Sequence, residues 1–176
     1  IACVSHRLAA LCHRERVVEY KRRLERLYAR GRVAACGHQC VAISRDGRVL
    51  TWGKNGTGGT EAPTDAGYKA VSAGFNHAAA LRDDGRIVTW GATCQRFRAP
   101  TDAGYKAIAT GLLHSIGLRN DGSVVTRGSD GQRTDEPTNA GFVAIAAGNL
   151  HSLALHEDGT IVTWGNNDYD QRSGWP

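Results

Sequence analysis

Short apolar runs separated by polar residues and glycines recur along residues 31–176. The last three runs are residues 144–147, 151–155 and 161–164. Runs of four or five residues that are rich in Val, Ile, Thr and Trp predict β-strands. Asp158-Gly159 lies between the second and third runs, and this dipeptide favours the type I′ turn of a β-hairpin.

The pattern occurs in four copies. Residues 67–103 and 104–140 are identical at 18 of 37 positions, whereas unrelated segments share about two by chance. A later copy follows at 141–176, and an earlier one, with one residue deleted near Gly37, occupies 31–66. Every copy contains the Asp-Gly dipeptide, and every copy has a proline near its end: Pro63, Pro100, Pro137 and Pro176.

A unit of three or four strands cannot bury a face alone, so the units must pack on one another. Small residues such as Ala146 and Gly148 allow close approach at one end of a sheet, and Leu155 and Trp164 fill the wider end. This taper predicts an all-β, β-propeller-like array of four blades, a partial or open propeller, with a linear solenoid as the alternative. A fourth strand would be short or at an edge, because proline lacks the N–H that a central ladder needs.

Residues 1–30 predict a separate element, a basic amphipathic α-helix that ends at Gly31. Its apolar stripe recurs at helical spacing: Val17, Tyr20, Leu24, Leu27 and Tyr28. We expect this stripe to pack on the first repeat. The chain then divides into residues 1–30 and a repeat domain at 31–176.

Positive charge is concentrated in the predicted helix. Residues 1–32 carry nine Lys and Arg against three Glu, whereas the rest of the chain carries 13 basic and 14 acidic residues. This is not the charge distribution of a whole domain built for nucleic acid. A solvated face is the plain interpretation. The sharper one is docking to an acidic protein, an anionic lipid surface or RNA through four arginines: Arg14, Arg22, Arg26 and Arg30.

Cysteine usage favours an intracellular, reducing compartment. There are five cysteines and no Cys-x-x-Cys, so a disulfide framework is not expected. Because the chain starts at Ile1 rather than methionine, import into an organelle is compatible with it. No run of 18 apolar residues occurs, so we expect no transmembrane segment.

The copies resemble the repeat of the regulator-of-chromosome-condensation family. The matching residues are Ala147-Gly148, His151-Ser-Leu-Ala-Leu155, Asp158-Gly159 and Trp164-Gly165-Asn-Asn167. In their short copies, each ending near a proline, they look most like the compact propeller type that inhibits β-lactamases. The resemblance implies a β-propeller, usually of seven blades, that binds proteins, and in one branch guanine-nucleotide exchange on a small GTPase.

The sequence departs from the family pattern in several places. Only four units are present, and the long insertions of the exchange factor are missing. Gln39 stands where the later copies have histidine, and Arg127 stands where the others have tryptophan. These differences weigh against exchange activity.

No group of residues predicts catalysis. His77, His114 and His151 occur once per copy, whereas a catalytic histidine needs a partner at one site, so we interpret them as packing and hydrogen-bonding residues. Cys36-Gly-His38-Gln-Cys40 has zinc-ligand types, but its spacing is uncommon and no fourth ligand is evident. We therefore expect no catalytic residue, no cofactor, no metal and no enzymatic activity.

Residues that do not follow the repeat are the better functional candidates, and they lie in the loops after the closing glycines. Arginine and aromatic side chains are typical of interface hot spots. The candidates are Arg96, Phe97, Arg98, Asp130, Arg133, Tyr169, Asp170 and Trp175. If the units are blades, these loops share one face.

The sequence therefore predicts a non-catalytic protein–protein interaction scaffold. It would be a subunit of a larger complex or a fragment of a longer propeller, with a partner covering the open blade edges. The alternatives are a regulator of a small GTPase and a protein inhibitor of an enzyme.

Overall fold

The repeat region folds entirely into β-sheets. The computed structural model describes residues 31–53, 62–91, 99–128, 133 and 135–173, which form four antiparallel sheets of three strands each. The strands are β1 (Val33–Cys36), β2 (Gln39–Ile43), β3 (Val49–Gly53), β4 (Tyr68–Ala73), β5 (His77–Arg82), β6 (Ile87–Gly91), β7 (Tyr105–Thr110), β8 (His114–Arg119), β9 (Val124–Gly128), β10 (Phe142–Ala147), β11 (His151–His156) and β12 (Ile161–Gly165).

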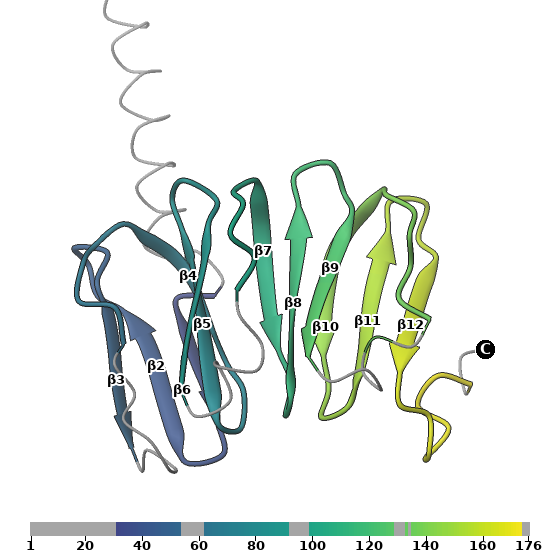
Figure 1. Cartoon of the computed structure of the whole chain (residues 1–176), viewed down its shortest axis with the longest axis horizontal. Helices are drawn as coiled ribbons and strands as arrows, with labels where there is room; N and C mark the ends of the chain where they lie inside the picture. Colours follow the sequence, from purple (N-terminus) through teal and green to yellow (C-terminus); the bar gives the residue numbers. More distant parts are fainter. Residues whose placement is uncertain (1–30, 54–61, 92–98, 129–132, 134, 174–176) are drawn as a thin grey trace, which may run out of the picture. The chain divides into compact units, whose positions relative to one another are not determined.

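Each sheet is a meander in which consecutive strands are hydrogen-bonded neighbours. The sheets stand side by side in chain order (Figure 1), and we number them as the first to fourth blades. The prediction of an all-β array of four propeller-like blades is confirmed for the described residues, which contain three strands per blade. The predicted helix lies outside the described residues.

The apolar core lies between the sheets. One cluster, which contains Val41 and Trp90, joins the first and second blades, and another, which contains Leu118 and Trp164, joins the third and fourth. A smaller cluster around Tyr105 joins the second and third. Both faces of each middle blade are therefore covered by its neighbours, and burial couples every blade to the next.

Small residues allow the blades to approach closely at one end. A Cβ on Gly74 would lie 2.4 Å from the carbonyl oxygen of Gly111, and a Cβ on Gly111 would lie 2.3 Å from that of Gly148. No side chain fits at either place. The predicted close approach at the glycine end is therefore confirmed. The predicted place of Trp164 at the opposite, wider end is wrong, because Trp164 and Ala147 both pair with Ser152, next to Gly148.

The Asp-Gly dipeptides lie at hairpin turns, but the predicted turn type is wrong. A type I′ turn needs positive φ at both central residues. Gly47 has φ +82°, whereas Asp46 is not among the residues with positive φ. The N–H of Gly47 donates to the carbonyl of Ser44 at 3.0 Å, so glycine is the fourth residue of the turn. This is the three-residue hairpin loop in which a left-handed glycine follows a type I turn.

The hairpin tips also bind the next blade. The carbonyl oxygen of Gly85 accepts the N–H of Tyr105 at 3.0 Å, and that of Gly122 accepts the N–H of Phe142 at 2.9 Å. Gly47 makes the same contact with Tyr68 at 3.1 Å. The glycines are therefore needed for the turn and for close contact between blades.

The first blade differs from the others in its opening hairpin. Cys36 pairs with Gln39 across a two-residue turn, and Gly37 has φ +60°, as the first central residue of a type II′ turn requires. The bulge that the other first strands share, as between Tyr68 and Ala70, is absent from the β1–β2 register. In the strand register, Cys36 therefore occupies the position in the first blade that Gly74 has in the second, and Gly37 lies in the turn.

Gly122→Ala should destabilise the protein more than Gly47→Ala. Both glycines have nearly the same φ, +84° and +82°, so the strain of a left-handed alanine, about 1 kcal/mol, is common to both. The new Cβ would lie 2.6 Å from the amide N of Gly141 in the first case and 3.3 Å from that of Gly67 in the second. We expect an additional loss of roughly 1 to 2 kcal/mol for Gly122→Ala, because its contacts with the fourth blade break. Urea unfolding of both variants measures the difference, and equal losses would contradict it.

Candidate protein-interaction surfaces

The repeated histidines bind from one blade to the next. His77 Nε2 lies 3.0 Å from Ser115 Oγ, and His114 Nε2 lies 3.0 Å from Ser152 Oγ. In the first blade, Gln39 takes the histidine position and donates from Nε2 to the carbonyls of Gly74 and His77 at 2.7 and 2.9 Å. The interpretation of His77 and His114 as packing and hydrogen-bonding residues is confirmed.

Tryptophan and threonine form a second contact between blades. The indole N–H of Trp164 donates to Thr126 Oγ1 at 3.0 Å, and both side chains are buried. Trp90 is buried at the equivalent place between the first and second blades. Packing between blades therefore accounts for the burial of both tryptophans, although the indole N–H of Trp90 has no hydrogen-bond partner among the described residues.

Burial keeps the central histidine neutral. Removal from water, with smaller effects of the nearby His77 and His151, lowers the pKa of His114 to about 4. Burial also lowers the pKa of His77. An imidazole that stays neutral across the ordinary pH range holds its hydrogen bond to the neighbouring serine without adding a buried charge.

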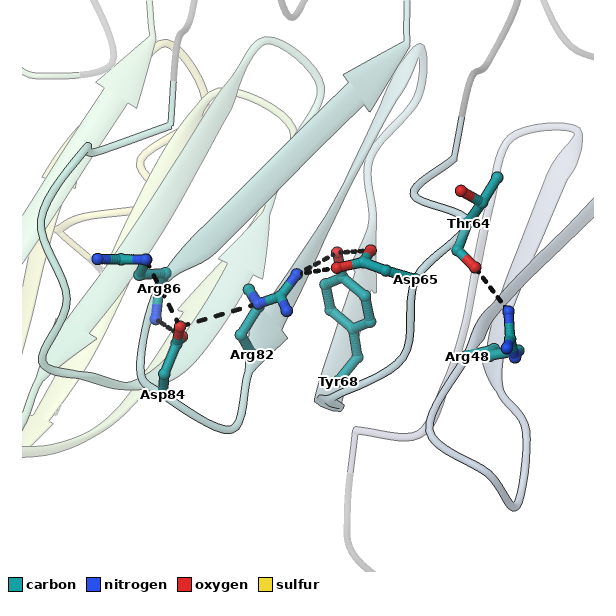
Figure 2. Close-up of polar contacts among 7 residues, drawn as sticks. All are labelled: Arg48, Thr64, Asp65, Tyr68, Arg82, Asp84 and Arg86. Atoms are coloured by element: carbon teal, nitrogen blue, oxygen red, sulfur yellow. Dashed lines mark hydrogen bonds and ion pairs between the residues drawn. The ribbon is translucent and has the colours of Figure 1, made fainter.

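A row of paired charges runs along the hairpin tips (Figure 2). The guanidinium of Arg82 forms an ion pair with Asp65 and lies 5.0 Å above the ring of Tyr68, whose hydroxyl donates to Asp65 at 2.8 Å. The hydrogen bond from Arg82 is the main cause of the lowered pKa of Asp65. Asp65 lies in the connection before the second blade. We call the cluster of Asp65, Tyr68 and Arg82 the linker anchor, because it fixes that connection to the blade.

The linker anchor is repeated once and then replaced. In the third blade, Arg119 lies 2.6 Å from Asp102 and 5.0 Å from the ring of Tyr105. In the fourth blade, Phe142 and His156 take the tyrosine and arginine positions, and their rings meet edge to face at 5.5 Å. His156 Nε2 lies 3.1 Å from the carbonyl oxygen of Ala140, in the connection, and its Nδ1 lies 3.0 Å from Asp158 of its own hairpin.

A groove of about 660 Å³ lies beside these charges. It is lined by Arg82, Asp84, Arg86, Thr89 and Pro100, among others. Asp84 Oδ1 accepts the backbone N–H of Arg86 at 3.0 Å, and its Oδ2 lies 3.8 Å from the Arg86 guanidinium. Among the described residues that line it, the groove has no histidine, no cysteine and one carboxylate, that of Asp84.

Two connecting loops lie together beyond the ends of β9 and β12. Arg172 forms an ion pair with Asp135 at 2.7 Å and also donates to the carbonyl of Gly165 at 3.1 Å. Asn167 Oδ1 accepts the backbone N–H of Arg172 at 2.8 Å, which holds the last loop closed. Tyr169 projects from this loop with 87% of its surface exposed. We call residues 133, 135, 136 and 166–173 the loop surface.

Three of the predicted interaction residues lie on the loop surface. Arg133 contacts Glu136 at 3.8 Å, Tyr169 is exposed, and Asp170 has a left-handed backbone with φ +56°. The other candidates lie outside the described residues: Arg96, Phe97, Arg98, Asp130, Trp175, Arg14, Arg22, Arg26 and Arg30. The sequence analysis did not select Asp135 and Arg172, because an ion pair between two loops has no local sequence signal.

In the described part of the chain, no three His, Cys, Asp or Glu side chains gather in a way that could hold a metal ion. The thiols of Cys36 and Cys40 are both free. Among the same residues, no helix has the length and apolar character needed to span a membrane.

Two segments of the chain match a known repeat. Residues 68–94 and 142–171 match the family model of the regulator of chromosome condensation (RCC1) repeat. They lie in the second and fourth blades. The resemblance inferred from the sequence is thereby confirmed: the chain carries repeats of this type. No curated protein sequence matches the chain.

Solved β-propellers share the fold. The CRINKLY WD40 ectodomain of the Arabidopsis thaliana receptor kinase ACR4 is 26% identical, with a TM-score of 0.65 over 76% of this chain and 49% of that chain. The ectodomain of the Physcomitrella patens receptor kinase CR4 is 20% identical, with a TM-score of 0.64 over 74% and 37%. Yeast RCC1 (Prp20), solved bound to Kap60, is 20% identical, with a TM-score of 0.60 over 77% and 43%. The chain spans about half or less of the length of these proteins.

His114→Gln should remove part of the acid sensitivity of the fold. The unfolded histidine binds a proton near pH 6.5 and folded His114 only near pH 4, so its contribution to stability is lost as pH falls through this range. Between pH 7.5 and 4.5 the loss is about 2 to 3 kcal/mol. Glutamine cannot titrate, and Gln39 shows that it fits this position. Urea unfolding at both pH values should show a smaller pH effect in the variant, and an unchanged effect would contradict the assignment.

Proposed function

We propose that this chain, which carries repeats of the regulator-of-chromosome-condensation type, works as a non-catalytic protein–protein interaction scaffold. The supporting observation is that repeated side chains and loop side chains have different roles. Repeated polar and aromatic groups bind blade to blade, as His114 and Trp164 do, while the loop surface presents Tyr169 to solvent. The scaffold would act as a subunit of a larger complex or as part of a longer propeller.

The loop surface has the properties of a preorganised binding surface. The Arg172–Asp135 ion pair and the hydrogen bonds of Asn167 hold the loops before any partner arrives. Holding a loop in its bound conformation reduces the entropy lost on association. An exposed tyrosine adds a large amphipathic contact at a low cost in side-chain freedom. The partner class that fits is a protein with an apolar pocket and a polar rim.

Regulation of a small GTPase is the second candidate. The structure of yeast Prp20 was described with its binding to Gsp1p and to histones, and that protein shares the fold at 20% identity. This chain spans 44% of it, so exchange activity does not transfer with the fold. A nucleotide-release assay separates the two candidates, because a scaffold leaves unchanged the rate at which a small GTPase releases its bound nucleotide. An inhibitor would instead slow a target enzyme at stoichiometric concentration.

The free thiols of Cys36 and Cys40 fit a reducing intracellular compartment, which we propose as the site of action.

A double variant of the loop surface should lose partner binding without unfolding. Arg133→Glu with Tyr169→Ser changes two side chains that are not in the core. Loss of an aromatic hot spot costs 2 kcal/mol or more in binding free energy, about a thirtyfold loss of affinity. A partner captured from the source extract and then purified should show this by calorimetry.

The matched control is Lys106→Glu. Its exposed side chain lies on β7, at the start of the third blade and near the hairpin tips. The control should keep full affinity. Equal losses in both proteins, or none in the double variant, would refute the loop surface as the binding site.

Reversing Arg22 and Arg26 to Glu should weaken binding of an acidic partner most at low salt. These residues lie in the predicted basic helix, outside the described residues. Charge attraction is screened as the Debye length falls from about 10 Å at 0.1 M salt to about 3 Å at 1 M. Titration of the partner at several salt concentrations measures the effect. If neither affinity nor its salt dependence changes, the charge of this segment takes no part in binding.

A further inference from the structure

Two blade faces have no neighbouring sheet in the described structure. One belongs to the first blade and is called the leading face: Val33, Ala35, Cys40, Ala42, Leu50 and Trp52. The other belongs to the fourth blade and is called the trailing face: Ala144, Ala146, Leu153, Leu155, Ile161 and Thr163. Neither set contains a charged residue.

In the second to fourth blades, the face equivalent to the leading face packs against the preceding blade. Trp90 and Trp164 occupy the position of Trp52, and the preceding blade leaves them only 4% and 0% exposed, whereas Trp52 is 55% exposed. Leu50 is likewise 50% exposed, while Val88 at its position packs against the core between the first two blades.

The trailing face is the complementary surface. Leu118 and Ile116, at the positions of Leu155 and Leu153, are each 1% exposed because the fourth blade covers them. Leu155 and Leu153 themselves are only half-buried. The two free faces are therefore the two halves of one interface, which occurs three times within the chain.

We propose that two copies of this chain pair head to tail. The trailing face of each copy packs on the leading face of the other, so that all eight blades have neighbours on both sides. Each copy carries one face of each kind, so two copies cover every free face. The solved relatives support this number, because the chain spans 49% of the ACR4 ectodomain and 43% of yeast Prp20, and a pair has a comparable length.

Polar groups at the two faces match as they do inside the chain. Trp52 would donate its indole N–H to Thr163 of the second copy, as Trp164 does to Thr126 at 3.0 Å. At the equivalent place between the first two blades, the indole N–H of Trp90 has no partner among the described residues. The carbonyl of Gly159 is at the position of that of Gly122, which accepts the N–H of Phe142 at 2.9 Å. A Cβ on Gly159 meets nothing within 4 Å, so this tip is open.

One position departs from the internal interfaces. His151, at the position of His114, would face Cys40, where the internal partners of the histidines are Ser115 and Ser152. A thiol is a weaker hydrogen-bond partner than a hydroxyl. Cys40→Ser should therefore tighten the pairing severalfold.

This pairing is separate from the loop surface, because it uses sheet faces and not the loops. Light scattering of the full chain at concentrations in the tens of micromolar should give twice the chain mass. Trp52→Lys and Leu155→Glu should each give a monomer, because every interface of a pair contains one Trp52 and one Leu155. Circular dichroism verifies that both variants remain folded.

Mixing the two variants distinguishes head-to-tail pairing from other arrangements. The mixed pair has one unchanged interface and one in which lysine meets glutamate, so the mass should return to twice that of one chain. A symmetric contact of two leading faces would be broken by Trp52→Lys, unaffected by Leu155→Glu and not restored by mixing.

Three results would overturn the proposal. A monomeric wild-type chain would mean that another element, such as residues 1–30, covers the leading face. An open series of larger masses would mean that two copies do not close. Failure of the mixture to recover the double mass would exclude contact between leading and trailing faces. None of these results bears on partner binding by the loop surface, so the two proposals fail independently.

Discussion

The packing of one three-stranded sheet on the next is the interaction on which the rest of the structure depends. No sheet has a core of its own, since the buried clusters around Val41, Tyr105 and Trp164 all lie between blades. The hairpin glycines, the histidine–serine pairs and the linker anchors all connect one blade to its neighbour or to the adjoining connection. A blade taken alone would expose the face that stabilises it, so the blades must fold against one another.

The strands and their order could be predicted from the sequence because the same local pattern occurs four times in the chain. An apolar run, an Asp-Gly turn and a second run define a hairpin wherever they occur. The turn type could not be predicted, because Asp-Gly fits both a type I′ turn and a type I turn followed by a left-handed glycine. The second is the one seen here, where the carbonyl groups of Gly85 and Gly122 accept hydrogen bonds from the next blade. Those bonds are tertiary contacts and have no local signal.

The candidate site was predictable only in part. Tyr169 differs from the residues at its position in the other copies and stands out once the copies are aligned, whereas Arg133 is the same residue as Arg96 one copy earlier. The structure places Arg133 and Tyr169 in loops. The Arg172–Asp135 ion pair joins residues 37 apart, and nothing in either loop's sequence indicates it. The same limit applies to the free faces: Trp52 has a sequence context similar to that of Trp90, yet among the described residues no sheet precedes its blade, and Trp52 is exposed.

The linker anchor determines where copies could be exchanged. Asp65 belongs to the first copy in the sequence, whereas its partner Arg82 belongs to the second, so each anchor crosses a copy boundary. Asp102 forms an ion pair with Arg119 in the present chain. Excision of residues 104–140 would remove Arg119 and place Asp102 next to His156 instead. The imidazole already lies 3.0 Å from Asp158. A shortened array would thus lack the guanidinium that holds Asp102 in the present chain, although the strands of its remaining blades would be unchanged.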